Sequence, residues 1–274
     1  MKVILLAAGY GTRLQKDIQG KEEFSHLINV PKPLLPLNGV PLASRWLNLV
    51  KKVPAIKFPE DVIIVTNDYY LDSFLVWAEQ YNFPIENIVN DGSTTNDNRL
   101  GAIADIKFAA DRFENNHDTM IIGGDTLFPI DFNLELEVSK FLGKQAKSPT
   151  ILFYSLDEGI DTSEKGIVDI EMIPNTGDYR VTRFIEKPKP HETNSRIASP
   201  CFYLLDSYSV TYIDKFLDFN KTDKYSRDAP GHFVKYLCEN LKEVNAREVG
   251  KRFDVGRLSD YVEANEYFTQ TDAK

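Results

Sequence analysis

The residues best suited to chemistry form a glycine-rich segment near the start of the chain, Leu6-Ala7-Ala8-Gly9-Tyr10-Gly11-Thr12-Arg13-Leu14. Small residues let backbone N–H groups approach an anion, and the Arg13 guanidinium offers paired donors that match phosphate oxygens. Pro31 and Pro33 flank Lys32 and stiffen its segment, which holds the ammonium in a constant direction. The pattern favours a site for a phosphorylated ligand, although a tight turn with a surface arginine and a solvated lysine would fit the same residues.

Two common phosphate-binding motifs do not fit this segment. The dinucleotide-binding pattern needs a third glycine or an alanine that opens a helix, whereas Leu14 stands there and a polar loop is expected to follow. The P-loop pattern needs Gly-Lys followed by Ser or Thr, and this is missing at the required spacing.

A carboxylate stands at the end of a later apolar run, Ile121-Ile122-Gly123-Gly124-Asp125. An Asp at the carboxyl end of a strand is well placed for Mg²⁺, a cation that prefers oxygen ligands and phosphates. The same residue could equally cap the following turn. The run therefore indicates a candidate metal ligand at Asp125 and leaves both interpretations open.

The composition limits the classes of partner. The chain has 274 residues with 32 Lys and Arg against 41 Asp and Glu, so its net charge is -9. Nucleic acids and anionic membranes need a basic surface, so neither is expected as a partner. The longest apolar run, residues 3–8, is strand-sized and too short for a membrane span or a signal peptide. With only Cys201 and Cys238 and no disulfide expected, we predict a cytoplasmic protein.

Strands and helices alternate through the first half of the chain. Continuous apolar runs predict strands, and apolar residues at helical spacing predict helices. This alternation is typical of a mostly parallel sheet covered on both faces, in which ligands bind at the carboxyl ends of the strands. The expected strands are 2–7, 61–66, 86–90 and 119–123, and the expected helices are 41–53, 69–81 and 99–113.

In the second half, four expected strands follow one another without long helices between them. No linker rich in Pro, Gly or Ser separates this half from the first. We therefore expect one continuous domain over residues 1–274. The expected strands are 150–156, 166–171, 179–185, 197–205 and one near 248–254, and the expected helices are 207–219, 228–240 and 258–268.

Two motifs in order, LAAGYGTRL and then PKPLLPLNGVPL, resemble the signature of the sugar-phosphate nucleotidylyltransferases, also called nucleoside-diphosphate-sugar pyrophosphorylases. The resemblance implies an α/β fold of three layers, Rossmann-like, with a mostly parallel but mixed central sheet. It implies a nucleotide-binding half over 1–130 and a sugar-phosphate-binding half over 131–274. The implied reaction is a Mg²⁺-dependent transfer of a nucleotidyl group from an NTP to a sugar 1-phosphate, giving an NDP-sugar and pyrophosphate.

The resemblance also implies roles for individual residues. Arg13, Lys32 and Asp125 are the expected catalytic residues, and Asp125 with Asp254 of the Asp-Val-Gly turn would hold Mg²⁺. The expected nucleotide-binding residues are Leu6, Ala8, Gly9, Gly11, Thr12, Arg13 and Gly101, and the expected sugar-phosphate-binding residues are Gly166, Glu186 and Lys187. From the residues alone, Glu186 and Lys187 could instead be a surface charge pair.

The chain departs from the family pattern at several places. Residues 15–30 are longer than usual between the two motifs and could be a lid or an oligomer contact. Ser199-Pro200-Cys201 stands where the family often has Asn-Ala-Gly. The loop 90–98 is rich in Asn, Asp and Thr, and Asp97 or Asn98 could cap the next helix, as Asp228 could cap a later one.

Other functions stay open at this stage. Cytidylyl transfer to phosphocholine or another phosphorylated alcohol would use the same chemistry, and a non-catalytic regulatory subunit would bind nucleotide sugars. Because no hexapeptide repeat follows the last expected helix, a C-terminal β-helix is not expected, and neither is an activity besides transfer. A homo-oligomer is possible.

Overall fold

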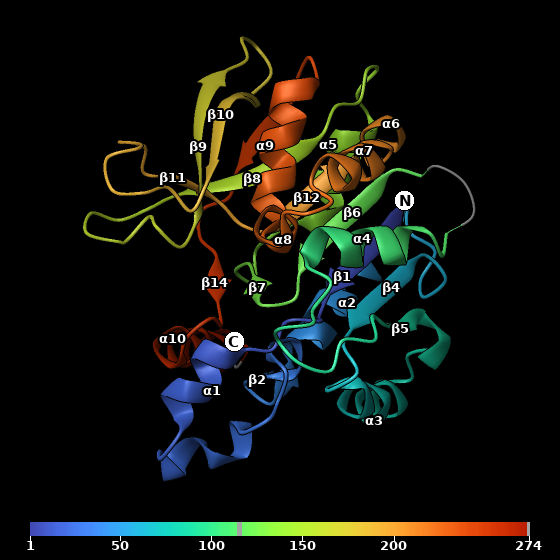
Figure 1. The fold of residues 1–274 in the computed structure, drawn as a ribbon, viewed down its shortest axis with the longest axis vertical. Coiled ribbons are helices and arrows are strands. Elements are labelled where there is room, and N and C mark those ends of the chain that lie inside the picture. The colour runs from blue at the N-terminus through green and yellow to red at the C-terminus, as the bar shows by residue number, and fades with distance from the viewer. Residues whose placement is uncertain (114–116, 273–274) are drawn as a thin grey trace.

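A ten-stranded mixed sheet forms the centre of the computed structural model, which describes residues 1–113 and 117–272 (Figure 1). Within these residues, seven of the ten strands run in one direction, and β10, β11 and β12 run in the other. The strands in sheet order are β11 (Ile197–Ser199), β9 (Gly166–Met172), β10 (Tyr179–Glu186), β13 (Asn245–Glu248), β8 (Thr150–Ser155), β12 (Phe202–Leu205), β6 (Thr119–Gly123), β1 (Lys2–Leu6), β4 (Val62–Thr66) and β5 (Ile88–Asn90).

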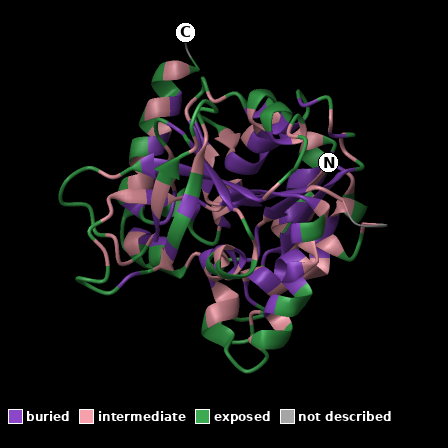
Figure 2. Ribbon diagram, turned by 90° about the horizontal axis from the view of Figure 1, so that it is seen from above, coloured by how far each residue is buried: buried purple, intermediate pink, exposed green. Residues whose placement is uncertain are grey.

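Helices cover both faces of this sheet. Alternate residues of β1 point to opposite faces, so Val3 and Leu5 join one apolar core and Ile4 joins the other. The exposed residues lie on the outer surfaces of the helices, in the loops and along parts of β9 and β10 (Figure 2). The first core is covered by α1 (Thr12–Ile18), α2 (Leu42–Val50), α3 (Leu71–Tyr81), α5 (Leu134–Leu142) and α10 (Leu258–Thr271), and the second by α4 (Ala102–Ala110), α7 (Tyr212–Phe219) and α9 (Pro230–Asn240). The predicted three-layer α/β fold with a mostly parallel, mixed sheet is confirmed.

Four parallel strands place their carboxyl ends along one edge. Strands β4 and β6 flank β1, and β5 pairs with β4 on the outer side. Leu6 at the end of β1 lies opposite Val65 and Gly123. The glycine-rich segment and Asp125 follow β1 and β6 directly, so the fold brings both to this edge.

The expected polar loop after Leu14 is wrong. Residues 12–18 form α1, and a 3₁₀ helix, η1 (Glu22–Leu27), follows it. Gly11 begins α1 with a positive φ of 62°, a conformation that glycine adopts without steric cost. Leu14, Ile18 and Leu27 are fully buried in the core. Ile18 and Leu27 therefore anchor residues 15–30 to the core, although most residues of this segment are exposed.

The second half contains further differences from the expected elements. The strand expected over 197–205 is two strands, β11 and β12, because Pro200 has no N–H to donate to a neighbouring strand. The strand expected near 248–254 is β13 and the short β14 (Phe253–Asp254). The helix expected over 207–219 is α6 (Ser207–Val210) and α7, and α8 (Lys224–Asp228) precedes α9. Helix α5 was not expected.

The described residues also bear on the predictions about the cysteines and about membrane-spanning segments. Cys201 and Cys238 are free thiols. No helix there is both long enough and apolar enough to cross a lipid bilayer.

Candidate active site

A cavity of about 240 Å³ lies at the carboxyl ends of β1 and β6. The glycine-rich segment forms one wall, and residues after β6 form another. Seven of the predicted site residues border it, namely Leu6, Ala8, Gly9, Gly11, Lys32, Gly101 and Asp125. The other lining residues are Ala7, Pro33, Arg99, Ala102, Asp105, Gly123, Gly124, Cys201, Asp228 and Pro230.

Neighbouring strands hold the glycine-rich segment in place. The Ala7 N–H donates to the Val65 carbonyl at 2.7 Å. The buried Asn67 side chain, which follows β4, donates to the Ala8 carbonyl at 2.8 Å. On the other side, the Gly124 N–H donates to the Leu6 carbonyl at 2.9 Å. The segment is thus tied to β4 and to the end of β6, which leaves its path little freedom.

Lys32 and Asp125 form an ion pair inside the cavity. Lys32 begins the short 3₁₀ helix η2 (Lys32–Leu34), and its Nζ lies 3.0 Å from Asp125 Oδ2. Burial alone would raise the pKa of Asp125, but the Lys32 ammonium and, more weakly, the Arg252 guanidinium outweigh it and lower the pKa. Asp125 therefore stays ionised, and the pair keeps a cation and an anion where a phosphate and its counterion would meet.

Asp254 lies close to Asp125 in the backbone framework. Strand β14 pairs with β7 (Thr126–Leu127), which places Asp254 opposite Thr126, and the Val255 N–H donates to the Asp125 carbonyl at 3.1 Å. The Asp254 carboxylate is paired with Arg252 at 2.8 Å. It borders a second cavity of about 430 Å³ that also contains Lys165 and Tyr154.

The two carboxylates suit a hard divalent cation. Mg²⁺ is usually held by one or two carboxylates together with substrate phosphates. Asp125 directly precedes β7, and Asp254 lies in β14, the strand paired with β7, so neighbouring segments offer two carboxylates. Among residues 1–113 and 117–272, no group of three or more His, Cys, Asp or Glu side chains could enclose a metal. The donor set therefore fits a cation that is completed by a bound phosphate.

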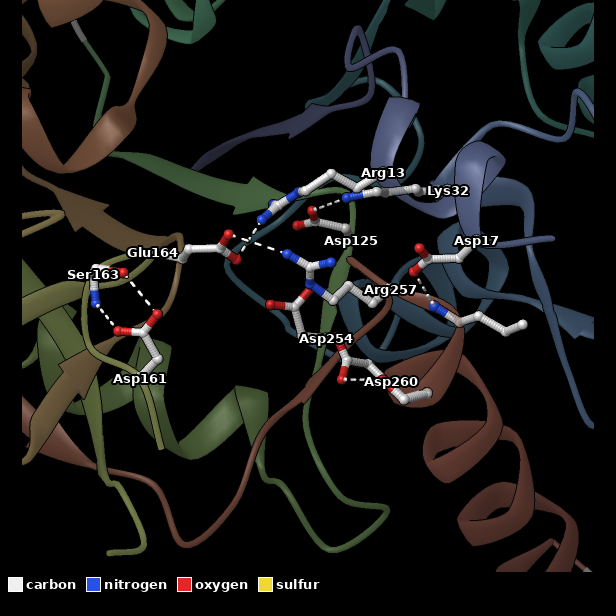
Figure 3. Close-up of polar contacts among 12 residues, drawn as sticks. Arg13, Asp17, Lys32, Asp125, Asp161, Ser163, Glu164, Asp254, Arg257 and Asp260 are labelled. Atoms are coloured by element: carbon white, nitrogen blue, oxygen red, sulfur yellow. Dashed lines mark hydrogen bonds and ion pairs between the residues drawn. The ribbon is translucent and has the colours of Figure 1, made fainter. Parts of the chain in front are cut away.

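Arg13 does not border the cavity. It extends from α1 to Glu164, with Nη1 at 2.5 Å from Oε2, and both side chains are about half exposed. Glu164 also pairs with Arg257 at 3.2 Å, so that one carboxylate links the two arginines (Figure 3). Thr12 precedes Arg13 and lies outside the cavity wall as well. The Arg13 guanidinium, which was predicted to hold the nucleotide, is therefore paired with the Glu164 carboxylate in this structure.

Gly166, Glu186 and Lys187 come together in a separate group. Glu186 at the end of β10 lies opposite Gly166 of β9. Its carboxylate also contacts the start of α9, where a Cβ added to Gly231 would lie 1.9 Å from Oε2, so only glycine fits there. Burial raises the pKa of Glu186 to about 7, against a smaller opposite effect of Lys187. Lys187 itself is exposed.

Three polar residues of the cavity were missed or misinterpreted. The Arg99 guanidinium binds the Asp228 carboxylate through two contacts, Nε–Oδ1 at 2.6 Å and Nη2–Oδ2 at 2.9 Å. The predicted capping role of Asp228 is wrong, because Ala229 is the N-cap residue of α9 and no side chain caps the helix. Asp105 carried no predicted role. Arg99 and Asp228 are 129 positions apart, and no sequence pattern predicts that they meet.

The predicted cap of the other helix is wrong too. Gly101 begins α4, and no side chain caps it. The Asn98 side chain instead accepts hydrogen bonds from the N–H groups of Thr94 and Thr95, at 3.0 and 2.9 Å. Asn98 therefore shapes the loop before the helix.

Comparison with known proteins agrees with this arrangement. The sequence model described as nucleotidyl transferase matches residues 2–271. The chain belongs to the nucleotidyl transferase family. A protein named as a mannose-1-phosphate guanyltransferase of Sulfolobus acidocaldarius is 29% identical over 266 residues, which are 97% of this chain and 62% of that protein. A protein named bifunctional protein GlmU of Methanococcus aeolicus is 23% identical over 97% of this chain and 54% of that protein.

Solved structures show the same fold. An apo UDP-glucose pyrophosphorylase superposes with a TM-score of 0.71 at 19% identity and covers 99% of both chains. A glucose-1-phosphate thymidylyltransferase of Bacillus anthracis gives 0.68 at 21% identity, covering 97% of this chain and 94% of that one. The resemblance to the sugar-phosphate nucleotidylyltransferases is thereby confirmed at the level of the family. This chain spans between one half and two thirds of the two curated relatives' lengths.

Proposed function

We propose that this chain transfers a nucleotidyl group from an NTP to a sugar 1-phosphate, with release of pyrophosphate and with Mg²⁺ as cofactor. One observation carries the proposal. A single cavity brings the glycine-rich segment, Lys32, Asp125 and Gly101 together at the carboxyl edge of the parallel strands. Its two ends suit a triphosphate and a base.

The triphosphate end uses positive charge. In the proposed reaction an oxygen of the sugar phosphate attacks the α-phosphorus of the NTP, in line with the departing pyrophosphate. The Lys32 ammonium neutralises charge that develops on the phosphates, which is the main task of a protein in phosphoryl-type transfer. Arg13 reaches the triphosphate once it separates from Glu164. The nucleophile is already ionised, so no general base is required.

The sugar-phosphate end uses the group around Glu186. Lys187 is exposed and offers its ammonium to the sugar phosphate. Glu186 has a pKa of about 7, so near neutral pH it can accept a hydrogen bond from a sugar hydroxyl or donate one. Gly166, opposite Glu186, has no side chain, so the Phe184 ring and the Glu186 carboxylate lie close to its backbone.

Asp125 and Asp254 are the residues that would hold Mg²⁺. When bound, the cation supplies positive charge that offsets the triphosphate and the nucleophile together. The Lys32 ammonium that now faces Asp125 would be released toward the phosphates. The ion pair with Lys32 lowers the pKa of Asp125 and keeps it ionised until then, and the Asp254 carboxylate is paired with Arg252.

Pyrophosphate release, measured with and without Mg²⁺, tests the proposal. ATP, GTP, CTP, UTP and dTTP are each combined with glucose 1-phosphate, mannose 1-phosphate, N-acetylglucosamine 1-phosphate and phosphocholine. We expect one clearly preferred pair, loss of activity in EDTA, and loss in Lys32→Ala but not in the control Lys16→Ala, which changes an exposed lysine. Preference for phosphocholine would show that the acceptor is a phosphorylated alcohol and not a sugar 1-phosphate. If the protein binds nucleotide but no pair gives turnover, it is instead a regulatory subunit.

A further inference from the structure

A buried acid borders the same cavity as Lys32 and Asp125. Asp105 lies in the first turn of α4, one turn after Gly101, and is only 6% exposed. Its Oδ1 is buried and accepts no hydrogen bond from an N–H or hydroxyl donor among the described residues. Buried polar atoms in folded proteins nearly always have a partner, so the partners of this carboxyl group must be a neighbouring acid, a bound ligand or both.

The surroundings of Asp105 determine which oxygen is left open. Its carboxyl group is hydrogen-bonded to that of Asp91, which follows β5. Asp91 in turn accepts hydrogen bonds from the Ser93 N–H at 2.7 Å and hydroxyl at 2.8 Å. Two carboxyl groups in contact share a proton. The proton therefore lies between one oxygen of each acid, which leaves the other oxygen of the Asp105 carboxyl group as an acceptor.

The other groups that face Asp105 favour its neutral form. Burial raises its pKa to about 8, and the negative charges of Asp91 and Asp228 act in the same direction. Asp228 is itself paired with Arg99 across the cavity wall. Tyr10, whose hydroxyl donates to Ser93 at 3.1 Å, is the remaining titratable neighbour. At neutral pH Asp105 is thus an uncharged acid with one carbonyl-like oxygen to offer.

We propose that Asp105 recognises the nucleobase, with the carboxyl oxygen that does not contact Asp91 accepting a hydrogen bond from an N–H group on the edge of the base. The inference rests on the proposed function, which places the phosphates near Lys32 and Asp125. A nucleotide that extends from there along the cavity has its base beside Gly101, Ala102 and Asp105. A base that turns no N–H toward Asp105 leaves the acceptor buried and unpaired, so it binds more weakly. Asp105 is therefore a specificity-determining residue.

Two substitutions separate this role from a structural one. In Asp105→Asn, the new amide N–H₂ can donate to Asp91 while its oxygen faces the cavity, which preserves the acceptor. In Asp105→Leu, the acceptor is replaced by an apolar group of similar size. Asp97→Asn, an exposed acid in the loop before α4, is the control. Thermal unfolding of the full-length chain checks that each variant is folded.

The measurements are KM and kcat for each NTP, and direct binding of each NTP by calorimetry. For Asp105→Leu we expect the preferred NTP to bind about tenfold to a hundredfold more weakly, with a smaller spread among the five bases and kcat changed less than KM. Asp105→Asn should keep the preference. Inorganic triphosphate should bind all variants equally, because it has no base.

Two results would overturn the inference. Asp105→Leu could retain the wild-type affinity and base preference, or Asp105→Asn could lose the preference as fully as Asp105→Leu does. Failure of the proposed function is a different result, since the wild-type chain would then release no pyrophosphate. The calorimetric comparison of the variants would still decide whether Asp105 recognises the base.

Discussion

Asp125 and Asp105 border the same cavity, and their pKa values are shifted in opposite directions. The Lys32 ammonium lies 3.0 Å from Asp125 Oδ2, and the pKa of Asp125 is lowered. Asp105 lies against Asp91 instead, and burial with that second acid raises its pKa to about 8. One cavity therefore holds a charged carboxylate and a neutral carboxylic acid at the same pH.

The contrast shows how neighbours assign different tasks to the same side chain. A carboxylate beside a cation stays ionised and suits a metal or a phosphate counterion, whereas a buried acid beside another acid stays protonated and suits hydrogen bonding. Pairs of titratable groups pushed apart in this way are typical of functional sites. The predictions below test each side of this comparison.

The largest effect is expected from removing the charge at the phosphate end. Asp125→Asn keeps the shape but loses the charged carboxylate, so Lys32 loses this counterion and the proposed Mg²⁺ site loses one of its two carboxylates. We expect kcat to fall about 10²–10³-fold, the usual loss for one electrostatic group in a transition state. Steady-state kinetics over a range of Mg²⁺ concentrations measures it. Asp131→Asn, an exposed acid nearby in the chain, is the control, and near-normal activity in a folded Asp125→Asn protein would refute the metal assignment.

An intermediate effect is expected on stability at the base end. The folded chain keeps the Asp105 proton to about pH 8, and the unfolded chain releases it near pH 3.8. Between these values the unfolded state binds fewer protons, so the free energy of unfolding falls as pH rises, by at most about 1.4 kcal/mol per pH unit. Above about pH 8 this contribution is lost in full.

Asp105→Asn removes this one contribution and leaves the others in place. Urea unfolding of both proteins at several pH values from 5 to 8 measures it. We expect the stability of wild type to fall more steeply with pH than that of the variant. Parallel curves would mean that Asp105 is ionised in the folded chain, which would remove the contrast with Asp125.

The smallest effect is expected where Glu164 occupies Arg13. Glu164→Gln removes the charge that holds Arg13 and Arg257, and Arg13 becomes free to bind the triphosphate. Exposed ion pairs contribute about 0.2–1 kcal/mol, so we expect KM for the NTP to fall by at most about fivefold and stability to change little. The difference should shrink at high salt, where exposed charges are screened. An unchanged KM at low salt would mean that Glu164 does not compete for Arg13.

The first half of the fold was largely predictable. Buried strands such as β4, Val62–Thr66, are continuous apolar runs, and the α3 helix carries apolar residues at helical spacing. Local patterns suffice there because a fully buried strand is apolar throughout and a surface helix is apolar along one side. Helix α1, which contains Leu14, was not predicted. Its start depends on a backbone turn at Gly11, and polar residues separate its two buried residues, Leu14 and Ile18.

The second half was less predictable because its boundaries depend on pairing. Residues 197–205 look like one strand, but Pro200 breaks it: β11 and β12 both pair with β8, and β11 also pairs with β9 whereas β12 also pairs with β6. Strand β14 has two residues and exists only because β7 lies beside it. No local pattern of two residues predicts a strand.

The sequence by itself determined the family, the three-layer α/β fold, and the motifs that carry Gly9, Gly11, Lys32 and Asp125. These follow from residue types at short spacing, which act through local geometry. The tertiary structure alone decided which charges meet. It joined Arg99 to Asp228, Arg13 to Glu164 and Asp105 to Asp91. Electrostatic and hydrogen-bonding partners are set by distance in space, and that distance depends on how the whole sheet and its helices pack.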